Sequence, residues 1–285
     1  MNQPEISFEL FPPKRPDGIE ALLRVADKLA GFDPAFISVT YGAGGSSRER
    51  TLGVTSALAE IAPAAGHITC VGASCAEVDK VLEEYWAAGV KRIVALRGDP
   101  LEGIGAAYAP HEEGYAYADD LIRGAKKIAD FDVSVGCYPE THPEARGLQD
   151  ELDNLKRKID AGADRAITQF FFEPEIFLRY RDAAADAGID KPIVPGVMLQ
   201  PNFKGLQKMA GLCGAFVPLK ISQAYEGLDD DAPARDRATI DLVSEICTRL
   251  VGEGVNAFHF YTMNKSAIAM EVCRNLGLNK DRRAA

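Results

Sequence analysis

A glutamate ends the first β-type run of the chain, in the stretch EISFELFPPK at residues 5–14. Apolar and polar side chains alternate there until two prolines stop the pattern, so Ser7 and Glu9 share one face. A carboxylate among apolar neighbours is costly to desolvate unless it is paired or its protonated form is used. Glu9 is therefore a candidate for acid–base chemistry. The alternative is a structural carboxylate that pairs with Lys14 or Arg48.

Polar side chains also end other short apolar runs. They are Thr40, Asp99, Tyr138, Gln169 and Tyr261. These groups form no obvious metal-ligand set, and His67 and Cys70 stand three apart on a presumed strand, where they face opposite ways. The sequence has no Gly-x-Ser-x-Gly elbow and no Walker loop, which argues against hydrolase and kinase chemistry.

A candidate phosphate-binding site lies in the sequence NLKRK. Asn154, Arg157 and Lys158 are spaced i, i+3, i+4, which places them on one face of a helix. Two cations and an amide suit a diphosphate. The residues alone leave open the alternative of a solvated basic face.

The pattern of apolar runs predicts the elements that would position these groups. Strands are expected at residues 5–11, 36–42, 67–74, 92–98, 133–139, 165–171, 193–199 and 256–262. Amphipathic helical patterns lie between them, with at least two inside 200–253 and one more at 264–276. The alternation predicts an α/β fold, a (β/α)8 TIM barrel whose strand ends meet at one mouth. A doubly wound sheet is the alternative, but GAGGSS (42–47) lacks the Gly-x-Gly-x-x-Gly spacing.

Size and charge restrict the class of protein. The chain has 285 residues, 47% of them hydrophobic, which suits a single barrel domain over 1–285. Its net charge of −10 argues against a nucleic-acid partner, which needs a basic face. No run reaches the roughly 18–20 apolar residues of a membrane helix, and no signal pattern opens the chain, so we expect a cytoplasmic protein without a membrane partner. Six scattered cysteines are expected to be reduced thiols.

Eight motifs occur in an order typical of one enzyme family. They are SFELFPPK, ISVTYGAGGS, HITC, ALRGDP, CYPETHPEA, NLKRKIDAGADRAITQFFFEPE, PNFK and FHFYTMNKS. They are spread over nearly all of residues 5–278. The chain resembles the methylenetetrahydrofolate reductases in their short bacterial form, which has the catalytic barrel without an appended regulatory domain.

The resemblance implies a flavin-dependent oxidoreductase of one-carbon metabolism and methionine biosynthesis. FAD would lie over the carboxyl rim of the barrel. NADH or NADPH would reduce it, and the hydride would pass to 5,10-methylenetetrahydrofolate to give 5-methyltetrahydrofolate, in a reversible reaction. Nicotinamide and folate would use the same space in turn. Family members commonly self-associate, so a homo-oligomer is also expected.

The family also implies roles for three residues near the reacting atoms. Glu9 matches the general acid, which protonates the amine nitrogen released when the methylene bridge opens. Asp99 matches an aspartate near the flavin and the pterin, where negative charge helps stabilise the cationic iminium. The alternative is a turn residue before Pro100. Gln169 matches a glutamine that contacts the folate, and its alternative is a barrel-lining amide.

The cofactor contacts carry over by the same match. FAD would contact Thr40, His67, Arg97, Gly98, Asp99, Tyr117, Ala118, Gly136, Tyr138, His142, Ala145, Glu151, Asn154, Arg157 and Lys158. This match favours a diphosphate-binding site over a solvated face for the NLKRK helix. For the two histidines a purely structural role is the alternative.

Four positions depart from the family pattern. Glu151 stands where an aspartate is often found among the FAD contacts. Gly205 and Met209 stand where the best-known bacterial member has a glutamine and a phenylalanine beside the folate. Met209 and Lys265 remain expected substrate contacts, because methionine can cover an aromatic ring and Lys265 keeps the charge of an arginine without its fork. We expect these changes to affect folate binding more than flavin binding.

Three other functions compete with this interpretation. Proline dehydrogenase also places a flavin on a (β/α)8 barrel, and would oxidise proline. A methyltransferase serving a corrinoid partner would bind folate without a flavin and would be colourless. The third is a protein that binds flavin or folate without catalysis. The presence of Glu9, Asp99 and Gln169 argues against it, because an inactive site has no need of all three.

Overall fold

The computed structural model describes residues 3–13, 15–41, 48–100 and 106–279. Lys14 and the Gly-rich segment 42–47 lie outside the described residues, and so does the side chain of Arg48. The pairing of Glu9 with Lys14 or Arg48 therefore stays a prediction.

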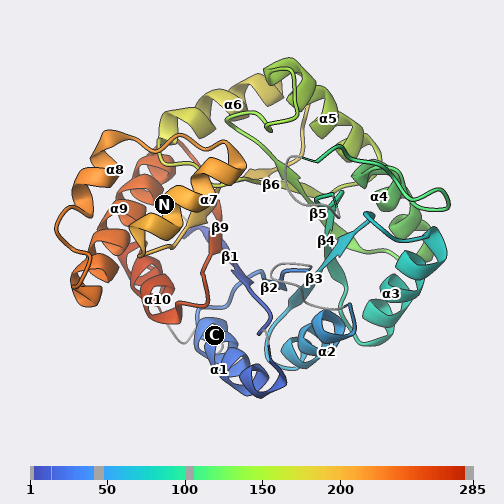
Figure 1. Cartoon of the computed structure of the whole chain (residues 1–285), viewed down its shortest axis with the longest axis horizontal. Coiled ribbons are helices and arrows are strands. Elements are labelled where there is room, and N and C mark those ends of the chain that lie inside the picture. The colour runs from blue at the N-terminus through green and yellow to red at the C-terminus, as the bar shows by residue number, and fades with distance from the viewer. Residues whose placement is uncertain (1–2, 14, 42–47, 101–105, 280–285) are drawn as a thin grey trace.

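Nine parallel strands form one sheet that is rolled into a nearly closed barrel (Figure 1). The strands are β1 (Glu5–Leu10), β2 (Phe36–Val39), β3 (Ala64–Thr69), β4 (Arg92–Leu96), β5 (Asp132–Cys137), β6 (Arg165–Thr168), β7 (Ile193–Val194), β8 (Gly196–Met198) and β9 (Ala257–Tyr261). Their order is β7-β6-β5-β4-β3-β2-β1-β9-β8, so the outermost strands β7 and β8 are consecutive in the chain. The chain segment between β7 and β8 therefore joins the two outermost strands of the ring, and the predicted TIM barrel is confirmed.

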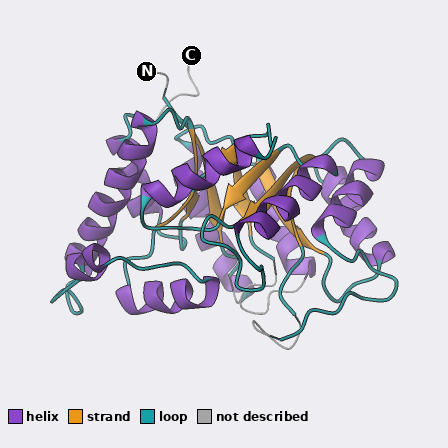
Figure 2. Cartoon of the chain, turned by 90° about the horizontal axis from the view of Figure 1, so that it is seen from above, coloured by secondary structure: helices purple, strands orange, loops and turns teal. Residues whose placement is uncertain are grey.

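Helices surround the strands (Figure 2). They are α1 (Ile19–Ala30), α2 (Arg48–Ala59), α3 (Cys75–Ala87), α4 (Ala118–Ile128), α5 (Leu148–Asp160), α6 (Pro174–Asp186), α7 (Phe203–Cys213), α8 (Leu219–Ala224), α9 (Ala232–Gly252) and α10 (Ser266–Asn275), with a 3-10 turn η1 (Pro16–Gly18) before α1. Three of them, α7 to α9, separate β8 from β9. Figure 1 shows α7 inside the ring of the other helices, next to β9.

All eight expected strands differ from the observed ones at one end or both, and two of them differ in more than a shortened end. The expected strand 193–199 is two short strands, because Pro195 interrupts it and proline has no N–H to donate to a ladder. The expected strand 67–74 instead covers Ala64–Thr69. Its small residues are weak strand formers, but Gly66 is required by space: a Cβ there would lie 2.3 Å from the ring of Tyr85.

The barrel separates an apolar exterior from a polar upper interior. Ile6, Phe8 and Leu10 are buried in the large cluster that joins the strands to the surrounding helices. The lower interior is filled by a separate apolar cluster of Phe36, Ala65, Val94, Ile167 and Val194. Alternation therefore turns Ser7 and Glu9 inward, as predicted, toward the carboxyl ends of the strands.

Candidate active site

Glu9 lies inside the barrel between two imidazoles. Its Oε2 is 3.4 Å from Nε2 of His67 on β3 and 3.8 Å from Nε2 of His259 on β9. Burial lowers the pKa of His67, an effect that the neighbouring Glu9 carboxylate opposes. The Nε2 of His67 forms no hydrogen bond of good geometry. His67 thus acts as a neutral neighbour of Glu9 at neutral pH rather than as a fixed positive charge.

Ser7 orients the second imidazole. Its Oγ lies 2.7 Å from Nδ1 of His259 and 3.3 Å from the carbonyl oxygen of Phe258. The short Ser7 contact fixes the orientation of the His259 ring, whichever ring nitrogen carries the proton. The Nε2 of His259 faces the Glu9 carboxylate at 3.8 Å, which is longer than a hydrogen bond. Sequence reasoning missed His259, although alternation with Tyr261 placed it on the inner face.

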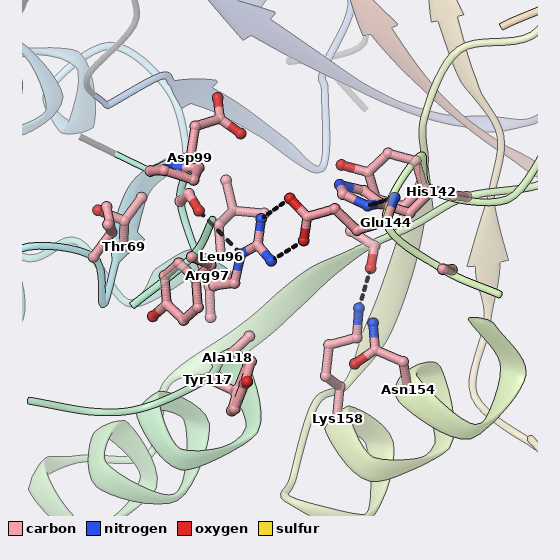
Figure 3. Close-up of a pocket in the computed structure, with 18 of the residues that line it drawn as sticks. Thr69, Leu96, Arg97, Asp99, Tyr117, Ala118, His142, Glu144, Asn154 and Lys158 are labelled. Carbon is pink, nitrogen blue, oxygen red and sulfur yellow. Dashed lines mark hydrogen bonds and ion pairs between the residues drawn. The ribbon is translucent and has the colours of Figure 1, made fainter. Parts of the chain in front are cut away.

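A second feature is a cavity of about 1170 Å³ beside the barrel mouth. Of the fifteen residues expected to contact FAD, thirteen line it, namely Arg97, Gly98, Asp99, Tyr117, Ala118, Gly136, Tyr138, His142, Ala145, Glu151, Asn154, Arg157 and Lys158. They come from the segment after β4, from β5 and the loop after it, from the start of α4 and from α5 itself (Figure 3). The cavity exceeds the roughly 300–1,000 Å³ that is usual for small-molecule pockets, so it can take a ligand of dinucleotide size.

The floor of this cavity is built by α5. The Lys158 Nζ donates to the carbonyl oxygen of Gly136 at 2.6 Å, and burial lowers the pKa of Lys158. Asn154 and Arg157 also line the cavity, and the Arg157 guanidinium contacts the Asn154 Oδ1 at 3.3 Å. The predicted i, i+3, i+4 face is therefore turned into the cavity, which contradicts a fully solvated basic face.

Glu151 has a different position from its neighbours on α5. Its two carboxylate oxygens accept the backbone N–H groups of Tyr138 and His142, at 3.2 and 3.4 Å. Burial raises the pKa of Glu151, while Lys158 opposes this effect. Glu151 thus holds the loop after β5 against α5, and in this way shapes the cavity wall.

Arg97 crosses from β4 toward the loop after β5. Its guanidinium makes a two-bond ion pair with Glu144, with Nη2 to Oε1 at 3.1 Å, and stacks over Tyr108 at 4.5 Å (Figure 3). Its Nε also donates to the carbonyl of Gly98, which has φ +86° and lies so close to β3 that a Cβ would be 2.5 Å from Val71. Three partners thus fix Arg97, and two guanidinium N–H groups remain for a ligand.

Two of the three threonines whose buried Oγ1 atoms lack a hydrogen-bond partner among the described residues lie at the carboxyl ends of β2 and β3. The Oγ1 atoms of Thr40 and Thr69 are buried and unpaired, and Thr69 also lines the cavity (Figure 3). Buried hydroxyls usually have a partner, so these atoms suit the polar edge of a bound ligand. Sequence reasoning missed Thr69 because it expected the third strand to end at residue 74. Thr40 and His67 lie at the barrel mouth outside this cavity lining, so their contact with FAD stays a prediction.

The expected folate contacts surround the other side of the mouth. Gln169 follows β6, and its Oε1 accepts the N–H of Phe170 at 3.0 Å. Met209 is half-buried on α7, whose apolar face packs against Phe170 and Tyr261. Lys265 is exposed just before α10, four residues after Tyr261, which pairs with Glu9 in the β1–β9 ladder. Gln169 and Lys265 therefore follow strand ends and Met209 packs near them, but their contact with a substrate stays a prediction.

Metal clusters and membrane-spanning helices are both absent from the part of the chain that the structure describes. No group of three or more His, Cys, Asp or Glu side chains there is placed to hold a metal ion. In the same ranges, no helix has the length and apolar character needed to cross a membrane.

Sequence comparison identifies related proteins. A family model described as methylenetetrahydrofolate reductase matches residues 1–277. The 5,10-methylenetetrahydrofolate reductase of Escherichia coli is 42% identical over 97% of this chain and 92% of its own length. The methylenetetrahydrofolate reductase (NADH) 1 of Arabidopsis thaliana is 37% identical over 97% of this chain, which spans only 49% of that protein.

Solved structures show the same fold at low sequence identity. A protein from Clostridium thermocellum, described as binding two copies of 5-methyl-5,6,7,8-tetrahydrofolic acid, aligns with a TM-score of 0.66 and 13% identity over 96% of both chains. A dihydropteroate synthase from Stenotrophomonas maltophilia aligns with a TM-score of 0.52 and 14% identity, over 97% of this chain and 94% of its own. At these identities the likeness supports the barrel fold alone.

Proposed function

Because the chain belongs to the methylenetetrahydrofolate reductase family, we propose that it is a flavin-dependent oxidoreductase that converts 5,10-methylenetetrahydrofolate to 5-methyltetrahydrofolate with NADH or NADPH, reversibly. The observation that carries the flavin part is the cavity beside the mouth, which gathers thirteen of the fifteen expected FAD contacts. The proposed FAD cavity is thus at the same edge of the barrel as Glu9, the residue before the end of β1.

The residues present suit FAD. Lys158, Arg157 and Asn154 would hold the diphosphate, since the face they form is cationic and lines the cavity. Arg97, already oriented by Glu144, would donate its remaining N–H groups to the cofactor. When bound, the flavin would supply hydride transfer between a reduced nicotinamide and the folate.

Glu9 would act as the general acid at the mouth. The imidazoles of His67 on β3 and His259 on β9 lie beside its carboxyl group, and the Glu9 side chain is 90% buried. A proton on Glu9 would therefore pass to a bound substrate rather than exchange with bulk water. That proton would go to the amine nitrogen released as the methylene bridge opens. Asp99, on the cavity wall, would stabilise the positive charge that develops on the carbon acceptor.

The competing functions are separated by one experiment, an anaerobic absorbance measurement on the purified protein. We expect a flavin band that bleaches with NADH or NADPH and returns when 5,10-methylenetetrahydrofolate is added. A colourless protein that takes up no FAD would contradict the flavin part and favour the corrinoid-linked methyltransferase. Bleaching by proline would favour proline dehydrogenase, and a flavin that neither nicotinamide bleaches would favour a silent binder.

We also propose that the chain is one catalytic domain that self-associates in the cytoplasm. A single peak at a multiple of the 30.8 kDa chain mass in size-exclusion chromatography with light scattering would support self-association. A monomer at micromolar concentration would contradict it.

A further inference from the structure

The side chain of Gln200 lies at the mouth with unused hydrogen-bonding capacity. Gln200 follows β8 and precedes Asn202, whose side chain caps α7 by accepting the N–H of Gly205 at 3.0 Å. The Gln200 Oε1 accepts the backbone N–H of Asn202 at 3.1 Å. The amide is therefore held by its oxygen, and its nitrogen lies beside Gly205 at the start of α7.

Gly205 leaves the space into which this nitrogen fits. A Cβ on Gly205 would lie 3.5 Å from Cδ of Gln200, an ordinary contact, and 3.3 Å from its Nε2, which is tighter than most Cβ contacts. The backbone of Gly205 is ordinary helix and needs no glycine for its conformation. Space for the Gln200 amide is thus the reason that the structure offers for a glycine within the first turn of α7.

Among the described residues, the Nε2 of Gln200 makes a weak contact. The nitrogen lies 3.9 Å from Sδ of Met209, one turn further along α7. A thioether is a poor acceptor, so two N–H groups at a half-buried position have little to bind. A polar group left this way is costly unless a ligand or water satisfies it.

This face of α7 is directed at the mouth. Met209 and Cys213 are spaced i, i+4 and share one side of the helix. Burial raises the pKa of the Cys213 thiol, and the Asp99 carboxylate adds to this effect, which places Cys213 near the cavity wall. Met209 belongs to the apolar cluster that holds Tyr261, the last residue of β9, and Phe170, just after β6, so the Gln200 amide beside Met209 lies near the carboxyl ends of these strands.

We propose that Gln200 is a substrate-contacting residue whose Nε2 donates a hydrogen bond to a carbonyl or ring-nitrogen acceptor of the reduced folate, and that Gly205 provides the room for it. This inference rests on the proposed function. Folate is favoured over the nicotinamide because a pterin carries several acceptors along its ring edge, whereas a nicotinamide ring offers only its carboxamide. Met209 beside the donor supplies an apolar cover for the flat ring.

The test compares Gln200→Met with Gln207→Met in the FAD-loaded enzyme. Methionine keeps the length of glutamine and removes only the amide, and Gln207 is an exposed residue of α7. The two half-reactions are followed by stopped-flow absorbance: reduction of the flavin by NADH, then its reoxidation by 5,10-methylenetetrahydrofolate. We expect Gln200→Met to raise the half-saturating folate concentration about tenfold, the effect of one lost hydrogen bond, with flavin content and NADH reduction unchanged.

A second variant tests whether the position of the Gln200 amide, and not only its presence, affects folate binding. Gly205→Ala keeps the amide but pushes it by a few tenths of an ångström, so we expect a two- to threefold rise in the same folate constant. Equal folate constants for Gln200→Met and Gln207→Met would overturn the inference, and so would equal losses in the NADH and folate steps. If the unmodified protein shows no flavin reduction by NADH or NADPH, the proposed function fails and this inference fails with it. A working relay with an unaffected Gln200→Met overturns the inference alone.

Discussion

Replacing Glu9 by glutamine tests the centre of the proposed mechanism. The two side chains have nearly the same shape, and a neutral amide can take the place of the carboxyl group beside the imidazoles of His67 and His259. The buried site therefore keeps its partners. We expect the thermal midpoint to move by no more than about 4 °C, which corresponds to about 1 kcal/mol for a chain of this size.

The catalytic effect should be far larger than the effect on stability. An amide has no dissociable proton to give to the departing amine nitrogen. General acid catalysis by a positioned side chain contributes about 10²–10⁴-fold, which equals about 3–5 kcal/mol in the barrier to the folate step. The step with nicotinamide needs no such proton, so its rate should remain within about twofold.

The assay is anaerobic stopped-flow absorbance of the flavin in two half-reactions, with Glu5→Gln as the matched control. Glu5 lies on the same strand but is exposed at the opposite end of the barrel. Folate-driven reoxidation by Glu9→Gln within about threefold of the unmodified protein would refute the acid role. Loss of both half-reactions together would show that Glu9 supports the site as a whole rather than the folate step.

Three further predictions follow from buried groups of the site. Lys158→Met should weaken FAD binding about 10- to 100-fold, the range for a lost charged hydrogen bond, and fluorescence titration with Lys156→Met as control would contradict this if the two affinities agree. Met209→Ala should raise the folate constant about tenfold with unchanged flavin content, and identical folate kinetics would remove Met209 from the substrate site. Burial holds the pKa of His67 below 6.5, so its contribution to stability is present above pH 6.5 and is lost as the pH falls further. The thermal midpoint should therefore drop as the pH falls below 6.5, and less steeply in His67→Gln; equal slopes would refute this.

The features that the sequence predicted correctly depend on neighbouring residues, and the features that it missed depend on tertiary contacts. Alternation placed Glu9 inside the barrel, and i, i+3, i+4 spacing placed Lys158 on the cavity side of α5, because both patterns depend on a few neighbouring residues. Motif order identified the family and with it most of the cavity lining. The strand at Ala64–Thr69 was misplaced because its small residues fit a ring from α3, a contact that local propensity does not contain.

The sequence by itself determined the alternating architecture, the family and the types of side chain at the strand ends. Only the tertiary structure decided which of them meet. The contact of Glu9 with His259 joins residues 250 positions apart, and it exists because closure of the barrel pairs β1 with β9. In the same way, the cap of α7 decides where the amide of Gln200 lies. Such contacts follow from how whole elements pack, which no short stretch of sequence contains.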